Sequence, residues 1–265
     1  MKREKIGIIG AGNMASALVK GMLTSEENKP EDIVCISKHH ESERMLAKAT
    51  GIETAKNLEE FAEKVDVIIL ACKPKDLEGL AGELAPLVKD HLLVSMLAGV
   101  TLAELAKFFS SARGIIRIMP NILAEVGASI TTFCFEKEPK AVDQKPFRRI
   151  VMPSGTALQV KEEQMDSFTI LFGSGPGIFM EFLDSYIKAA KKLGLDPEMA
   201  LPALDHLVLG TGMLLAQSGK TLEQLRDSVT SAGGCTEVAL KKMRERGLQD
   251  IMEETMISAL ERLQK

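Results

Sequence analysis

Ile6-Gly7-Ile8-Ile9-Gly10-Ala11-Gly12-Asn13-Met14-Ala15 is the stretch that decides the fold. In it a short apolar run gives way to a glycine-rich turn, and the turn leads into an amphipathic segment. The turn matches the pattern GxGxxA, in which Gly10 permits a tight turn, Gly12 lets a pyrophosphate approach the backbone, and the small Ala15 brings helix against strand. The free N–H groups and the dipole of the helix then favour an anion. The stretch therefore predicts a strand, a turn and a helix that bind a dinucleotide.

Short β-branched runs alternate with longer amphipathic segments on either side of this turn and through the first half of the chain. This alternation predicts an α/β fold, with an N-terminal Rossmann-type doubly wound sheet whose helices cover both faces. The predicted strands are residues 5–9, 32–37, 65–71, 92–95, 114–119, 127–135 and 156–160. The predicted helices are residues 13–23, 42–49, 58–63, 76–89, 102–109 and 141–151.

Strand signals stop after Lys161, and the rest of the chain reads as helix. We therefore predict two domains, a dinucleotide-binding Rossmann domain at residues 1–161 and an all-α C-terminal domain at residues 162–265. One central helix carries apolar side chains at spacings of three and four, which predicts that it is buried. These are Ile178, Phe179, Phe182, Leu183, Tyr186, Ile187 and Ala190. So much apolar surface is more than one copy can cover, and we expect a homodimer or higher homo-oligomer formed through these helices.

Composition excludes several classes of protein. Of 265 residues, 45% are apolar and 26% charged, which is ordinary for a globular chain. Because 33 Lys and Arg face 37 Asp and Glu, no global field attracts the protein to nucleic acid. Apolar runs such as residues 67–72 are far shorter than the roughly 20 residues of a spanning helix, so we expect no membrane partner.

The four cysteines, Cys35, Cys72, Cys134 and Cys235, form no CxxC pair and have no histidine at ligand spacing. They predict neither a metal site nor a disulfide framework. The basic start and the apolar residues 6–11 resemble a signal peptide, but glycines interrupt the run. We therefore expect a cytoplasmic protein.

The end of the second predicted strand bears on the choice of cofactor. Ser37-Lys38-His39 offers hydrogen-bond donors and positive charge where an Asp or Glu would hold the 2′-hydroxyl of NAD. No acid stands in this loop, which favours NADPH while leaving NADH possible. The alternative is a solvated loop that is basic by chance.

Two further loops follow predicted parallel strands. Ala71-Cys72-Lys73-Pro74 and the loop holding Ala98 both fall at carboxyl ends, outside which ligands bind in open α/β sheets. They would border the nicotinamide half of the cofactor. Ordinary turn chemistry at Pro74 and Gly99 is the alternative explanation.

A second glycine-rich turn stands in the helical half. The run from Thr230 to Thr236 leads into a predicted helix at residues 237–246. A small carboxylate could accept hydrogen bonds from the N–H groups of Gly234, Cys235 and Thr236. A capped helix entered through a tight turn explains the same residues.

Five separated motifs, in this order, resemble the pyrroline-5-carboxylate reductase family, whose members perform the last step of proline synthesis with NAD(P)H. The likeness spans nearly the whole chain, and its last motif is the most specific. The motifs are Gly10 to Gly21, Ala71-Cys72-Lys73-Pro74, Met119-Pro120-Asn121, Gly173-Ser174-Gly175-Pro176, and Leu225-Arg226-Asp227 running to Thr236. The resemblance implies a Rossmann domain, a helical domain that forms an interlocked dimer, and an active site between the two.

Residue roles follow from the same resemblance. It implies that the pyrophosphate, the adenosine phosphate, the adenine ribose and the nicotinamide are held in turn by different loops. The implied cofactor residues are Gly10, Gly12, Asn13 and Met14, then Ser37, Lys38 and His39, then Asn57, and lastly Ala71, Lys73, Pro74 and Ala98. The implied substrate residues are Ser231, Gly233, Gly234, Cys235 and Thr236, with the Thr236 hydroxyl close to the ring nitrogen as the catalytic group.

Some positions depart from the family pattern. Ile122 and Leu123 follow Met-Pro-Asn where Thr-Pro is usual, Ala232 replaces a proline, and Ile178 stands where an aromatic is common. His39 also stands where the family often has Arg. A divergent paralogue that reduces another cyclic imine is therefore an alternative.

Two rivals lie outside the family. A β-hydroxyacid dehydrogenase would need a lysine base on the long helix, yet no lysine follows Gly175 until Lys188. A non-catalytic redox sensor that binds dinucleotide would share the same motifs. The lack of an obvious strong acid suits imine reduction, because hydride transfer to an iminium carbon removes charge instead of creating it.

Overall fold

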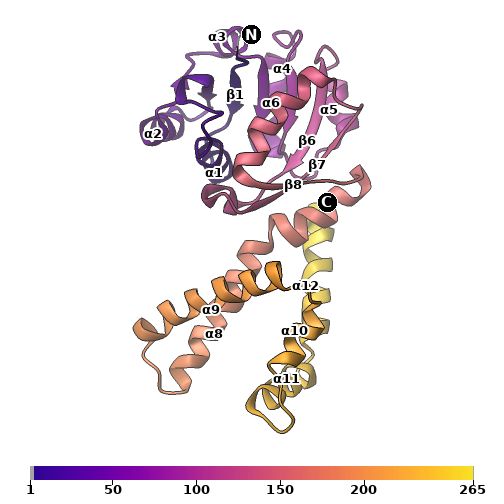
Figure 1. The fold of residues 1–265 in the computed structure, drawn as a ribbon. Helices are drawn as coiled ribbons and strands as arrows, with labels where there is room; N and C mark the ends of the chain where they lie inside the picture. The colour runs from indigo at the N-terminus through magenta and orange to yellow at the C-terminus, as the bar shows by residue number, and fades with distance from the viewer. Residues whose placement is uncertain (1–2, 265) are drawn as a thin grey trace. The chain divides into compact units, whose positions relative to one another are not determined.

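The computed structural model describes residues 3–264. Within them, one eight-stranded sheet has the order β3-β2-β1-β4-β5-β6-β7-β8 (Figure 1). Every neighbouring pair is parallel except β6 and β7, which are antiparallel. The strands are β1 (Ile6–Ile9), β2 (Ile33–Ile36), β3 (Glu53–Thr54), β4 (Val67–Leu70), β5 (Leu92–Ser95), β6 (Gly114–Met119), β7 (Ser129–Phe135) and β8 (Gly155–Gln159). The order β3-β2-β1-β4-β5-β6 confirms the predicted doubly wound, Rossmann-type sheet.

Helices cover both faces of this sheet, and a separate apolar core lies under each face. Phe61, Leu84 and Phe109 belong to one core, whereas Leu18 and Ile150 belong to the other. Burial from both sides explains why the residues of β1, β2, β4 and β5 are all buried. The helices are α1 (Asn13–Met22), α2 (His40–Thr50), α3 (Leu58–Lys64), α4 (Leu77–Leu84), α5 (Leu102–Phe108) and α6 (Ala141–Val151), with short turns η1 (Pro30–Asp32), η2 (Pro74–Asp76), η3 (Ile122–Val126) and η4 (Met152–Ser154).

Two local expectations differ from the structure. The strand β3 was not predicted, because two polar residues at a sheet edge carry no apolar run. The helix predicted at residues 76–89 ends at Leu84. Pro86 has no N–H to donate to a carbonyl of the preceding turn, so the ladder of hydrogen bonds cannot continue.

The chain divides into two compact units. One comprises residues 3–176 with 262–264, and the other is Gly177–Glu261. The division between the units falls after Pro176, whereas the predicted domain boundary falls after Lys161. The helices of the second unit are the greater part of α8 (Gly175–Lys192), followed by α9 (Pro197–Ser218), α10 (Leu222–Ser228), α11 (Cys235–Glu245) and most of α12 (Leu248–Leu263).

Residues 162–176 belong to the first unit because they pack onto the sheet. They contain η5 (Glu162–Gln164), α7 (Met165–Phe168) and the π-helical turn η6 (Thr169–Gly173). Met165 is fully buried in the core, and the buried Arg117 of β6 pairs through Nη2 with Asp166 Oδ1 at 2.8 Å. Helical periodicity in the sequence does not predict these contacts, and it therefore groups residues 162–176 with the helices that follow.

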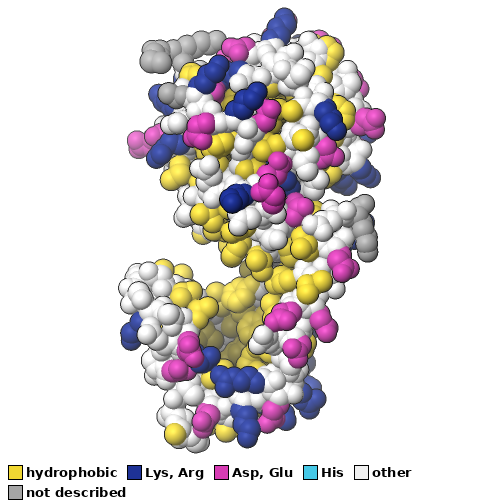
Figure 2. All heavy atoms as spheres, turned by 90° about the vertical axis from the view of Figure 1, so that its right-hand side faces the viewer, with side chains coloured by type: hydrophobic (Ala, Val, Ile, Leu, Met, Phe, Trp, Pro, Cys, Tyr) yellow, Lys and Arg dark blue, Asp and Glu magenta, His cyan; other side chains and the backbone are white. Residues whose placement is uncertain are grey.

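The expectation that α8 is buried is wrong for a single copy of the chain. Phe179, Phe182 and Tyr186 are 48%, 46% and 52% exposed, and Ala190 is the one buried residue of α8. Apolar side chains gather over a hollow of the helical unit in Figure 2. The cause is that this unit spreads its five helices without folding them around a core, so its apolar faces are left uncovered.

The helix α9 bears on the expectation that no segment of the chain is long and apolar enough to cross a membrane. Among the described residues it is the helix long and apolar enough to cross a membrane by length and composition, and 6% of its apolar window is buried. The prediction considered unbroken apolar runs, whereas an 18-residue window of α9 reaches a mean hydropathy of 1.5 although it includes Asp205. Length and composition are shared by spanning helices and by helices that pack against a partner.

Candidate functional site

Gly10 makes the turn between β1 and α1, and no other residue fits its place. Its φ is +115°, and a Cβ there would lie 2.5 Å from the Ala71 carbonyl oxygen. The Gly10 N–H donates to the Ile36 carbonyl at 2.8 Å, which fastens the turn to the end of β2. The tight turn predicted from the first glycine of the motif is therefore present.

Gly12 leaves the N-terminus of α1 open. It is the N-cap residue, its backbone is extended, and, apart from its chain neighbours, no atom of residues 3–264 lies within 4 Å of a Cβ built on it. Because the N-cap residue is glycine, it offers no side chain to accept a hydrogen bond from the N–H groups of the first turn. Ala15 is 1% exposed and packs in the core, as the third small residue of the motif requires. The first-turn N–H groups and the helix dipole are thus available to an anion, which fits a pyrophosphate.

Backbone hydrogen bonds bring four strand ends side by side at the carboxyl edge of the sheet. Ala71 N–H donates to the Ile9 carbonyl at 2.9 Å, and Met96 N–H donates to the Leu70 carbonyl at 3.0 Å. With the bond from Gly10 to β2, these contacts place the ends of β2, β1, β4 and β5 in a row. Just beyond this row Lys73 is the N-cap of η2 and Pro74 its first residue, and Ala98 follows the end of β5. The predicted nicotinamide residues therefore follow strands that end at the same edge of the sheet as the glycine turn, and Ala71 contacts Gly10 directly.

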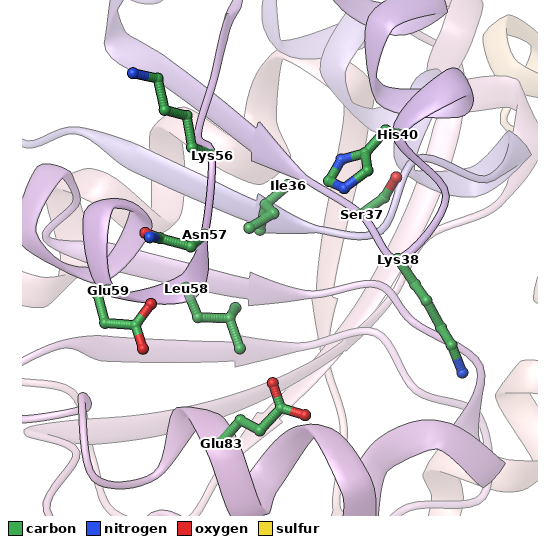
Figure 3. Close-up of a pocket in the computed structure, with 9 residues that line it drawn as sticks. All are labelled: Ile36, Ser37, Lys38, His40, Lys56, Asn57, Leu58, Glu59 and Glu83. Carbon is green, nitrogen blue, oxygen red and sulfur yellow. The ribbon is translucent and has the colours of Figure 1, made fainter.

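A cavity of about 390 Å³ lies beside the end of β2 (Figure 3). Three of the residues predicted for the adenosine end of the cofactor line it, namely Ser37, Lys38 and Asn57. His39 does not line it, whereas His40 does. Asn57 also caps α3, because its Oδ1 accepts from Glu60 N–H at 2.8 Å. The full lining is Ile36, Ser37, Lys38, His40, Lys56, Asn57, Leu58, Glu59 and Glu83.

A carboxylate lies next to this loop, although the loop itself contains no acid. Glu43 belongs to the first turn of α2 and is 4% exposed. Its Oε2 accepts from the Ser37 N–H at 2.5 Å, and its Oε1 lies 2.8 Å from His40 Nδ1. Sequence reasoning missed it because it searched the strand end alone. Acids in the first turn of the next helix, which the helix dipole favours, are the signal that would have found it.

Buried thiols near the sheet are poor nucleophiles. Burial, with a contribution from the Glu43 charge, raises the pKa of Cys35 to about 12. Burial raises the pKa of Cys134 to about 11 and also raises that of Cys72. All four cysteines are free, and the described residues hold no group of three or more His, Cys, Asp or Glu that could bind a metal ion.

Asn121 serves the structure locally. Its Nδ2 donates to the Phe172 carbonyl at 2.9 Å, and its Oδ1 accepts from Leu123 N–H at 3.1 Å. Its own N–H donates to Ser129 Oγ at 3.1 Å. The motif Met119-Pro120-Asn121 thus fastens the segment before α8 to the sheet unit.

The second glycine turn forms the N-terminus of α11, where the five predicted substrate residues lie together. Gly234 is the N-cap, its N–H donates to the Ser231 carbonyl at 3.0 Å, and Gly233 has a φ of +71°. Cys235 and Thr236 are exposed in the first turn. A carboxylate of the same chain already binds one N–H group of this turn, because Gly233 N–H donates to Glu237 Oε2 at 2.7 Å.

Comparison with known proteins matches both halves of the chain. Residues 162–265 match the family model "Pyrroline-5-carboxylate reductase dimerisation", and residues 5–99 match "NADP oxidoreductase coenzyme F420-dependent". Pyrroline-5-carboxylate reductase 2 of Bacillus subtilis is 36% identical over 99% of this chain and 93% of its own length. Pyrroline-5-carboxylate reductase of Staphylococcus aureus is 30% identical over 97% of this chain and 96% of its own.

Solved structures agree with these relatives. Plasmodium falciparum pyrroline carboxylate reductase with NADP bound superposes with a TM-score of 0.90, at 26% identity over 100% of this chain and 98% of that one. The 1-pyrroline-5-carboxylate reductase of Streptococcus pyogenes gives a TM-score of 0.87, at 28% identity over 98% of both chains. With an open glycine turn at the head of α1, and with close relatives along its whole length, this chain belongs to the pyrroline-5-carboxylate reductase family.

Proposed function

We propose that this protein reduces 1-pyrroline-5-carboxylate to L-proline with NADPH, as the last step of proline biosynthesis. The observation that carries the proposal is the open N-terminus of α1 at Gly12, within a chain that is 36% identical to a reductase of that name over 264 residues. The NADP-bound relative and the NADP-oxidoreductase match of residues 5–99 support NADPH as cofactor.

The residues of the first unit would hold this cofactor. Gly10, Gly12, Asn13 and Met14 would hold the pyrophosphate, Ser37 and Lys38 the adenosine phosphate and Asn57 the ribose. Ala71, Lys73, Pro74 and Ala98 would flank the nicotinamide. The uncapped helix end and the room above Gly12 support the first assignment.

When bound, NADPH supplies a hydride to the carbon of the substrate's C=N bond. The protonated substrate nitrogen carries positive charge before the step and none afterwards, so no strong acid is needed. The work of the chain is to position the ring and exclude water. Ser231 and the N–H groups of Cys235 and Thr236 would hold the substrate carboxylate, with Gly233 and Gly234 shaping the turn. The Thr236 hydroxyl would orient the ring N–H.

The C-terminal helices would join copies of the chain into a homodimer or a larger homo-oligomer. The family-model match of residues 162–265, which begins at the predicted domain boundary, supports this assignment. The exposed apolar face of α8 supports it independently, because each large apolar side chain that becomes fully buried contributes about 1.5–3 kcal/mol. We place the reaction in the cytoplasm, with no nucleic-acid or membrane partner.

Turnover tests the proposal directly. Purified protein with NADPH and 1-pyrroline-5-carboxylate should oxidise one cofactor for each proline formed. A panel of other cyclic imines run in parallel distinguishes a divergent paralogue, which would prefer a different ring. A redox sensor would bind NADPH without turnover on any imine, and that result would refute the proposed reaction.

A further inference from the structure

We propose that Glu43 is a positioning residue that favours NADPH over NADH by holding the His40 imidazole at the 2′-phosphate site. The proposal rests on the proposed NADPH-dependent function and names a determinant of cofactor choice within it. It concerns a carboxylate that does not line the cofactor cavity and an imidazole that does.

The geometry separates the two groups. The Glu43 side chain is 5% exposed, whereas that of His40 is 61% exposed. One Glu43 oxygen accepts from the Ser37 N–H, and the other lies 2.8 Å from His40 Nδ1. In Figure 3 the His40 ring and the Ser37 side chain lie close together on one side of the cavity, with Asn57 and Glu59 across from them.

The chemistry of the pair sets the direction of its effect. An ionised carboxylate can only accept a hydrogen bond, so Nδ1 of the ring carries the proton in this contact. With Nδ1 held by Glu43, Nε2 on the other side of the ring can contact a phosphate oxygen. A 2′-phosphate carries a charge of about −1.5 to −2. NADH lacks this phosphate and gains nothing from the pair.

The contact from Glu43 to Ser37 N–H could act alone, as a brace for the backbone of the loop. A loosened backbone would weaken NADPH and NADH together, because both share the adenosine ribose. A route through His40 weakens NADPH alone. The ratio of the two dissociation constants distinguishes the two explanations.

The experiment measures the Kd of NADPH and NADH by calorimetry for the full-length protein and its variants Glu43→Gln, His40→Ala and the double variant. We expect Glu43→Gln to raise the Kd of NADPH about tenfold, since a charge-assisted hydrogen bond is weakened, with the Kd of NADH within about twofold. The double variant should lose no more NADPH affinity than His40→Ala alone, because Glu43 acts through that ring.

Glu41→Gln is the matched control. It removes the same charge from the first turn of the same helix, where the Glu41 side chain is exposed, and it should leave both Kd values unchanged. Equal losses for both cofactors, additive losses in the double variant, or tighter NADPH binding by Glu43→Gln would each overturn the proposal. Should Glu43→Gln fail to fold, His40→Ala still decides, since it must weaken NADPH selectively. Wild-type protein without measurable NADPH binding would instead refute the proposed function.

Discussion

Substitution of Gly12 by aspartate should separate cofactor binding from stability. Gly12 is the N-cap of α1 with φ −75° and ψ 179°, a backbone conformation that any residue adopts. A Cβ there meets no atom within 4 Å among the described residues. Aspartate is a preferred N-cap residue, so its carboxylate should accept the first-turn N–H groups that the pyrophosphate would otherwise use. The variant should therefore fold normally and fail to bind NADPH.

The substitution is expected to raise the stability of the fold slightly and to lower the affinity for NADPH strongly. Replacing an N-cap glycine by aspartate adds a few tenths of a kcal/mol, and the charge on the helix dipole adds about as much, for a gain of about 0.5 kcal/mol. That gain corresponds to a rise in Tm of about 1–2 °C for a domain of this size. Losing two charge-assisted hydrogen bonds of about 1.5 kcal/mol each costs about 3 kcal/mol, which is a rise in the Kd of NADPH of at least about 100-fold.

Calorimetric titration with NADPH and thermal unfolding without ligand measure the two effects. Gly79→Asp, on the exposed surface of α4 with no neighbour within 4 Å of its Cβ, adds the same charge elsewhere and should leave the Kd unchanged. Gly10→Ala should lower both stability and affinity, because its Cβ would overlap the Ala71 carbonyl. Retained NADPH affinity in Gly12→Asp would refute the assignment of the pyrophosphate to this turn, and a Tm that falls by several degrees would contradict the N-cap reasoning.

Three further changes test other parts of the molecule. Thr236→Ala should lower kcat or raise the KM for the imine while the Kd of NADPH stays nearly constant, and unchanged steady-state kinetics would remove Thr236 from the mechanism. Phe182→Glu places a charge on the uncovered face of α8 and should shift the protein toward monomer in light scattering, with an unchanged mass counting against this face as the interface. Hydrogen bonds donated by the Thr101 N–H and hydroxyl lower the pKa of Glu104 in the folded protein. The contribution of Glu104 to stability is therefore complete above its pKa in the unfolded chain, about 4.3, and is lost as the pH falls through its lower pKa in the folded protein. The difference in Tm between wild type and Glu104→Gln should therefore shrink as the pH is lowered below about 4, and a difference that grows would contradict this sign.

The elements that sequence reasoning placed well are those with a strong local signal. The strands β5 and β6 and the helix α6 have the predicted bounds, because each is a short apolar or amphipathic run between clear breaks. The strand β3 has no such signal, since Glu53 and Thr54 are strand only through their pairing with β2. The predicted helix beyond Leu84 shows the opposite error, in which periodicity continued past a proline.

The candidate site divides in the same way. Gly10, Gly12 and the turn from Ser231 to Thr236 were predicted from sequence because each lies in one short glycine-rich segment, and the structure places these segments as turns at the N-termini of α1 and α11. The presence of His40 in the cavity lining was not predicted, because the sequence does not show that α2 begins at His40 and that His39 is its N-cap residue, outside the lining. The burial predicted for Phe182 failed because covering that face needs a surface that a single chain does not supply.

By itself the sequence determined the alternation of strands and helices and the need for glycine at the first turn. Both depend on forces within a few residues, namely the period of apolar side chains and the steric cost of a Cβ. Tertiary structure alone decided that Ala71 closes over Gly10, that Glu43 reaches back to Ser37 and His40, and that residues 162–176 pack on the sheet. Each of these depends on where the chain returns in space, which is fixed by the packing of the whole sheet and not by any local pattern.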